Sequence, residues 1–257
     1  YEIRLSLVGS EMCIRDRPDT LYTMTEILAD ELSHENGPRA VRLVALSGPT
    51  HAEEVALDLP TTIVSASPDL EAAEVVQEVF SNTCMRVYTN TDIKGVELSG
   101  AMKNVIALGV GISTGLGYGD NARAALITRG IAEIARLGVA MGCNVQTFAG
   151  LAGIGDLIVT ATSMHSRNNR AGILIGKGES PEQAVKEVGM VVEGINALPA
   201  AMELAEKYHV EMPIAQTVNA IVKEGMSASD ALRNLMSRDR KSEMPQGYAV
   251  SYTHLRA

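Results

Sequence analysis

The spacing of apolar residues changes near residue 91, and this change constrains the fold more than any other feature. Before it, short β-branched runs alternate with helical patterns. The predicted strands are 41–46, 61–66 and 85–88, and the predicted helices are 20–33, 51–57 and 68–80. Strands that alternate with helices form parallel sheets joined by crossover helices. The first part therefore predicts a parallel sheet of the nucleotide-binding type.

Helical periodicity dominates after residue 91. Helices are predicted over 93–112, 120–142, 146–153, 167–175, 181–188, 193–208, 213–222 and 229–236. Ser180-Pro181-Glu182-Gln183 is a capping box, and Ser67-Pro68 predicts an N-cap followed by proline at the first helical position. The fold class is therefore α/β followed by all-α.

Three segments follow from these patterns. Residues 1–91 are expected to form a truncated sheet domain, and 92–243 an all-helical domain. The ends, 1–17 and 244–257, lack a matching pattern and are expected to be foreign to the fold. A doubly wound nucleotide-binding domain has about six strands and opens on a GxGxxG turn. Neither is present, so we expect its first half to be missing.

Charge and composition exclude several classes of function. The net charge of −9 argues against a nucleic-acid groove, although a local basic pocket remains compatible with it. No apolar stretch reaches 18 residues, so no membrane insertion is expected. The cysteines, Cys13, Cys84 and Cys143, are widely spaced, which favours free thiols in a reducing cytoplasm over a disulfide or a metal site.

Lys103 is the first candidate for chemistry. On a helix it shares one stripe with small and apolar residues: Val96, Gly100, Ala107 and Val110. A buried lysine must be paired or its pKa falls, and either state suits proton transfer to a carbonyl oxygen. The alternative is a lysine whose stem extends along the surface to water.

Two further groups extend the candidate site. Gly153-Ile154-Gly155-Asp156 suggests a tight turn that presents a carboxylate to Lys103 or to a substrate hydroxyl, with an N-cap aspartate as the alternative. Ser166-Arg167-Asn168 combines a serine cap, a helix N-terminus and an arginine, which together suit a phosphate. The alternative is a solvated basic turn.

Two short strings complete the set. Ser47-Gly48-Pro49-Thr50-His51-Ala52 follows a strand, where ligands of open α/β sheets bind. There Gly48 would permit close approach of a cofactor, and Thr50 could donate a hydrogen bond. A lone histidine such as His51 is more typical of a structural role. Val191-Val192-Glu193-Gly194 places an acid beside a glycine, and its alternative is an ordinary helix start.

Taken in order, these strings resemble the bacterial NAD(P)-dependent glycerol-3-phosphate dehydrogenases. The resemblance runs from about Pro18 to Glu243 and rests on SGPTHAEEVA, GVELSGAMKNVIAL, NARAALITRGIAEI, GLAGIGDLIVTATSMHSRNNRAG and VVEGINAL. It implies a helical domain of the 6-phosphogluconate dehydrogenase-like type. The family's glycine-rich loop, and a substrate-contacting lysine before Thr20, have no counterpart.

The resemblance also implies roles for single residues. Lys103 matches the proton donor and acceptor, and Asp156 the acid that holds it. Substrate contacts are implied for Gly48, Thr50, Lys103, Asp156, Ser166, Arg167 and Asn168, and cofactor contacts for Ala52, Arg167, Val191 and Glu193. No metal is implied.

The implied reaction is the reversible reduction of dihydroxyacetone phosphate by NADH or NADPH to sn-glycerol 3-phosphate, in the cytoplasm, for phospholipid synthesis. The choice between NAD and NADP, and the oligomeric state, including a homodimer, stay open. Two alternatives remain: a related 3-hydroxyacid or ketopantoate-type reductase, and an inactive fragment that acts as a helical interaction module. A phosphate pocket at Ser166-Arg167-Asn168 favours the dehydrogenase.

Overall fold

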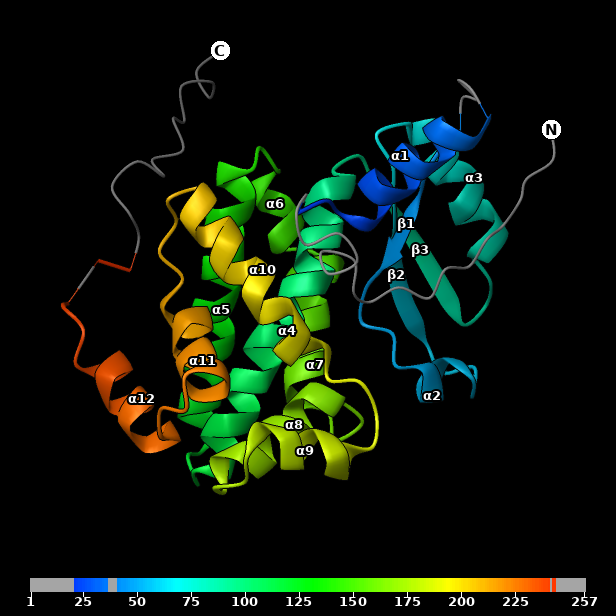
Figure 1. Cartoon of the computed structure of the whole chain (residues 1–257). Helices are drawn as coiled ribbons and strands as arrows, with labels where there is room; N and C mark the ends of the chain where they lie inside the picture. Colours follow the sequence, from blue (N-terminus) through cyan, green and yellow to red (C-terminus); the bar gives the residue numbers. More distant parts are fainter. Residues whose placement is uncertain (1–20, 37–40, 241, 244–257) are drawn as a thin grey trace, which may run out of the picture.

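The computed structural model describes residues 21–36, 41–240 and 242–243, and it places a small sheet beside a larger helical part (Figure 1). The first part consists of α1 (Met24–Asn36), β1 (Ala45–Ser47), α2 (Ala52–Val55), β2 (Thr61–Ala66), α3 (Leu70–Phe80) and β3 (Met85–Asn90). The predicted ends 1–17 and 244–257 lie outside the described residues.

The second part is helical throughout. It consists of α4 (Ile93–Gly115), α5 (Asp120–Ala140), α6 (Val145–Phe148), the π-helical turn η1 (Leu151–Gly155), α7 (Asp156–Thr162), α8 (Arg167–Gly176), α9 (Pro181–Val188), α10 (Glu193–Lys207), α11 (Pro213–Lys223) and α12 (Ala228–Met236). An α/β part followed by an all-α part is thus confirmed.

The sheet has the order β1-β2-β3, and its strand directions correct one expectation. β2 and β3 are parallel and are joined through α3, as predicted. β1 and β2 are antiparallel, with Ala45 opposite Ala66. Between them α2 is only four residues long, too short for a helix that carries the chain across the sheet to a parallel start. The chain therefore turns back, and the sheet is mixed rather than parallel.

Several element boundaries also differ from the prediction. α1 begins at Met24 rather than near residue 20, and the first strand is only Ala45–Ser47. Asp69, not Ser67, caps α3: its carboxylate accepts the backbone N–H groups of Glu71 and Ala72. The predicted helix 146–153 is broken, because α6 ends at Phe148 and η1 follows. The predicted range of α9 is confirmed, with Ser180 as its cap.

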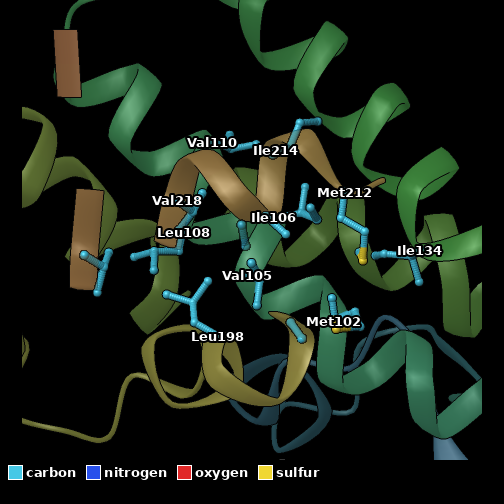
Figure 2. Close-up of a cluster of buried hydrophobic side chains, with 14 of the residues drawn as sticks. Met102, Val105, Ile106, Leu108, Val110, Ile134, Leu198, Met212, Ile214 and Val218 are labelled. Atoms are coloured by element: carbon cyan, nitrogen blue, oxygen red, sulfur yellow. The ribbon is translucent and has the colours of Figure 1, made fainter. Parts of the chain in front are cut away.

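α4 is the central element of the helical part (Figure 1). It contacts α5, α7, α8, α10 and α11, and it also touches β1. A helix that is apolar on all sides is buried on all sides, and α4 has fully buried residues around its circumference. Figure 2 shows its side chains among those of α5, α10 and α11; the labelled residues are Met102, Val105, Ile106, Leu108, Val110, Ile134, Leu198, Met212, Ile214 and Val218. Helix α4 therefore fixes where Lys103 stands.

One apolar window differs from what the sequence led us to expect. Among the described residues, Val145–Thr162 is long and apolar enough to cross a membrane, with a mean hydropathy of 1.3. It comprises α6, η1 and α7, and 44% of it is buried inside the protein. Because core helices of water-soluble proteins meet the same criterion, the window is weak evidence for a membrane span.

A buried carboxylate from α5 caps α11. Glu133 is 2% exposed and accepts hydrogen bonds from the backbone N–H groups of Ile214 at 2.8 Å and Ala215 at 3.3 Å. The residue before the helix, Met212, provides no side-chain cap. Burial raises the pKa of Glu133 to about 7, although the two backbone N–H groups and the charge of Arg136 lower it. This long-range cap secures α11 against α5.

Replacing Glu133 with glutamine is expected to flatten the dependence of stability on pH. In the folded protein this carboxyl keeps its proton up to about pH 7, whereas the unfolded chain releases it near pH 4.5. The folded state therefore binds more protons in this window, and the free energy of unfolding falls as pH rises, by up to about 3 kcal/mol. Urea unfolding at about pH 5 and pH 8 measures the slope. Equal slopes for parent and variant would contradict the assignment.

Candidate active site

Lys103 and Asp156 form an ion pair at the junction of α4 and α7. Lys103 Nζ lies 2.6 Å from Asp156 Oδ2. The side chain of Lys103 is 21% exposed and that of Asp156 only 4%. Lys103 therefore remains accessible to solvent or to a ligand, while Asp156 lies inside the protein. The structure does not have the alternative, a lysine that extends along the surface into water.

Asp156 is presented by a helix rather than by the predicted tight turn. η1 leads directly into α7, Asp156 is the first residue of α7, and Gly155 at the cap position is itself helical. One turn later, Thr160 donates its hydroxyl to Asp156 Oδ1 at 3.2 Å. Burial raises the pKa of Asp156, and the charge and hydrogen bond of Lys103, the Thr160 hydroxyl and the charge of His51 lower it. The carboxylate therefore depends on its lysine partner.

The N-terminus of α8 carries the predicted anion-binding group. Ser166 caps the helix, because its hydroxyl oxygen accepts the backbone N–H of Asn169 at 3.2 Å. Arg167, the first residue of α8, lies 2.7 Å from Glu193 Oε1 through its Nη2 atom. Glu193 is in turn the first residue of α10. One arginine therefore joins the starts of two helices.

Asn168 faces the protein interior. Its amide nitrogen donates to Asn104 Oδ1 at 3.0 Å and to Glu193 Oε2 at 3.4 Å, and its amide oxygen accepts the backbone N–H of Gly194 at 2.8 Å. The residue is 3% exposed. Within this structure its side chain joins α4, α8 and α10, and Asn104 places that network directly beside Lys103.

The segment after β1 reaches the same region from the sheet. Gly48 is buried, and a Cβ there would lie 3.1 Å from Ile63 Cα of β2. This close approach between backbones accounts for the glycine without a ligand. Thr50 donates its hydroxyl to the Gly48 carbonyl at 3.3 Å. Ala52 starts α2 and is exposed.

The residues predicted to contact a cofactor differ in exposure. Ala52 and Val191 are exposed, Arg167 is partly buried, and Glu193 is buried. Val191 lies two residues before Glu193, on the segment that leads into α10. An exposed apolar side chain thus precedes, by two residues, the carboxylate that pairs with Arg167.

Two residues of the site were missed at the sequence level. Thr160 stands four residues after Asp156, a spacing that places two side chains on one helical face, but residues 156–162 carried no helix prediction. Asn104 follows Lys103 directly and bonds to Asn168. No spacing signal links residues 104 and 168, because their contact is tertiary.

Two hollows lie elsewhere on the molecule. One of about 490 Å³ separates the sheet from α6 and η1, and its lining includes Tyr88, Asn90 and Gln146. A smaller apolar hollow of about 30 Å³ lies among α4, α5, α11 and α12. Neither lining includes Lys103 or Asp156, so the candidate site rests on the ion pair and its neighbours and not on an enclosed cavity.

Comparison with known proteins matches both parts of the chain to one family. Residues 92–233 match the C-terminal model of the NAD-dependent glycerol-3-phosphate dehydrogenases, and residues 14–88 match the N-terminal model. The N-terminal match begins within the segment 1–17. A glycerol-3-phosphate dehydrogenase [NAD(P)+] from Lactobacillus delbrueckii subsp. bulgaricus is 65% identical over 227 residues, 88% of this chain and 67% of that protein.

Further relatives agree. A glycerol-3-phosphate dehydrogenase [NAD(P)+] from Pelotomaculum thermopropionicum is 54% identical over 89% of this chain and 64% of its own length. The crystal structure of glycerol-3-phosphate dehydrogenase from Coxiella burnetii is 39% identical, with a TM-score of 0.77 over 83% of this chain and 65% of that one. The chain spans about two thirds of the length of these relatives. It belongs to the NAD-dependent glycerol-3-phosphate dehydrogenase family.

Proposed function

We propose that this chain provides the catalytic and substrate-binding part of an enzyme that reduces dihydroxyacetone phosphate to sn-glycerol 3-phosphate with NADH or NADPH. The single observation that carries the proposal is the 2.6 Å pair between Lys103 Nζ and Asp156 Oδ2. The helical part from residue 92 would hold substrate, and the sheet part up to residue 91 would face the cofactor. A cytoplasmic location fits the free thiols of Cys84 and Cys143.

Lys103 would act as the proton donor. When bound, the nicotinamide supplies the hydride that reduces the ketone carbon. The ammonium of Lys103 gives a proton to the carbonyl oxygen, which becomes the hydroxyl of the product, and in the reverse direction the amine accepts it. Asp156 holds the ammonium in place and favours its charged form until the proton leaves.

The phosphate would bind at the start of α8. Helix N-termini attract anions through their free N–H groups and dipole, and Arg167 adds a guanidinium suited to phosphoryl oxygens. Ser166 keeps a hydroxyl proton to donate while its oxygen caps the helix. Asn168 supports this site through its contacts with Asn104 and Gly194.

The residues present fit a nicotinamide cofactor. Val191 and Ala52 offer exposed apolar surface, and the pair of Arg167 and Glu193 offers a cation and an acceptor. These are complementary to the flat ring, the carboxamide and the anionic phosphates of NAD or NADP. Ala52, Arg167, Val191 and Glu193 are therefore the residues of this chain that would hold it.

Replacing Arg167 with alanine tests the phosphate site. We expect the dissociation constant for sn-glycerol 3-phosphate to rise by about tenfold to a hundredfold, since one charge-assisted hydrogen bond contributes roughly 1.5–3 kcal/mol. Isothermal titration calorimetry measures it. Saturated turnover, followed by NADPH absorbance in a chain extended to the length of its relatives, should change much less.

A matched control guards against an indirect effect. Glu193 is buried and loses this ion pair when Arg167 is removed, although Asn168 still donates to it, so the alanine variant also perturbs the start of α10. Arg167→Lys keeps the charge and loses only the two-pronged geometry, and it should bind substrate with intermediate affinity. Unchanged binding by both variants would remove Arg167 from the substrate site.

A further inference from the structure

The imidazole of His51 carries a buried nitrogen, Nε2. Within the described part of the chain, His51 Nε2 has no hydrogen-bond partner. His51 stands at the cap position of α2, yet its side chain makes no capping hydrogen bond. Buried polar atoms are nearly always paired, and an unpaired one costs roughly 1–3 kcal/mol. Such an atom beside a ligand site is explained when the ligand completes its hydrogen bond.

The loop that carries His51 lies against the two helices of the ion pair. Ser47 Oγ is 3.6 Å from where a Cβ on Gly100 would stand, and Gly100 is one turn before Lys103 on α4. Pro49 is 3.9 Å from the corresponding position on Gly155, the residue before Asp156. The segment from Ser47 to His51 therefore approaches the site from the side of the sheet.

His51 also faces the turn that leads to the candidate phosphate site. Its ring lies 5.9 Å from the ring of His165, centroid to centroid, at an interplanar angle of 55°. His165 immediately precedes Ser166, and its backbone N–H donates to Ser163 Oγ at 3.1 Å, which fixes the turn. Burial has the largest effect on the pKa of Asp156 and raises it. Lys103 and Thr160 lower that pKa, and the charge of His51 lowers it further. His51 thus contacts the turn that precedes α8, and its charge acts on the carboxyl of Asp156.

We propose that His51 is a further substrate-contacting residue, whose Nε2–H donates a hydrogen bond to a phosphoryl oxygen of the bound substrate. The inference rests on the proposed function for the identity of that ligand. The contact with the ring of His165 would hold the imidazole beside the turn that leads to Ser166. The anion is then held from two sides: by Arg167 on α8 and by an imidazole from the loop after β1.

Calorimetry on this chain with sn-glycerol 3-phosphate, inorganic phosphate and glycerol tests the proposal. His51→Phe keeps a flat ring and removes the donor, and it should weaken sn-glycerol 3-phosphate and inorganic phosphate by about tenfold. His51→Gln keeps an N–H donor and should recover part of the affinity. Binding of glycerol, which lacks the phosphoryl group, should be the same in the parent and in His51→Phe.

The control is His209→Asn. His209 follows the far end of α10 at a φ of 53°, which asparagine tolerates, and its replacement should leave all three ligands unaffected. If His51→Phe binds phosphate as the parent does while Arg167→Ala loses it, the role of His51 is overturned and the proposed function stands. If the parent binds neither phosphorylated ligand, the proposed function itself fails for this chain.

Discussion

Alanine in place of Lys103 is expected to lower turnover of dihydroxyacetone phosphate by about a thousandfold, the middle of the range for a lost general acid. The variant lacks the group that we propose as the proton donor to the ketone oxygen, and water would have to replace it. The assay follows NADPH absorbance in a chain extended to the length of its relatives, with circular dichroism to confirm that the variant folds. Turnover within a few-fold of the parent would refute the assignment.

Stability must be separated from catalysis in this experiment. Asp156 is 3% exposed, and removal of one partner from a buried ion pair costs roughly 3–5 kcal/mol. Lys103→Arg keeps a cation near Asp156, so this variant should fold well. Because the guanidinium does not release its proton at any working pH, turnover should stay as low as in Lys103→Ala. The double variant Lys103→Ala/Asp156→Asn should regain stability without regaining activity.

Local patterns in the sequence, the apolar spacing and the helix caps, predicted much of this architecture. The spacing of apolar residues located α4, α5 and α8 to α12 within a few residues, and Ser166 and Ser180 cap their helices as predicted. Lys103 was singled out because small and apolar residues share its helical stripe, and the structure pairs it with Asp156. Caps and amphipathic faces are determined within one or two turns, so a single sequence contains them.

Features set by tertiary contact could not be obtained in this way. The antiparallel pairing of β1 with β2 depends on how the chain turns over a four-residue α2. The pattern around Gly153 and Gly155 predicted a tight turn, but these residues belong to η1, which continues into α7. The buried Nε2 of His51 is visible only once the loop after β1 lies beside α7. In each case the deciding partner is remote in sequence.

The close packing of α4 against α8 is the clearest example of such remote dependence. Gly111 and Gly115 on α4 face Gly172 and Gly176 on α8, each pair with the spacing i, i+4. A Cβ on Gly111 would stand 2.9 Å from Gly172 Cα, and one on Gly115 would stand 2.9 Å from Gly176 Cα. Backbone therefore touches backbone, and no side chain can fit between the helices.

Replacing Gly111 with alanine is expected to destabilise the protein by about 3 kcal/mol, at the upper end of overpacking costs, because backbone atoms cannot rotate aside as a side chain can. In an unhindered helix the same change would stabilise by roughly 0.5–1 kcal/mol, so the predicted sign is diagnostic. Gly119→Ala is the control, because nothing lies within 4 Å of its Cβ position and its φ is −89°. Gly119 is the N-cap of α5, where alanine is less favourable than glycine, so a loss of at most about 1 kcal/mol is expected. Urea unfolding measures both changes, and a stabilised Gly111→Ala would show that α4 and α8 lie farther apart.

Since α8 begins at Arg167, the separation forced on the helices should also weaken binding of sn-glycerol 3-phosphate, which links the glycine contact to the site.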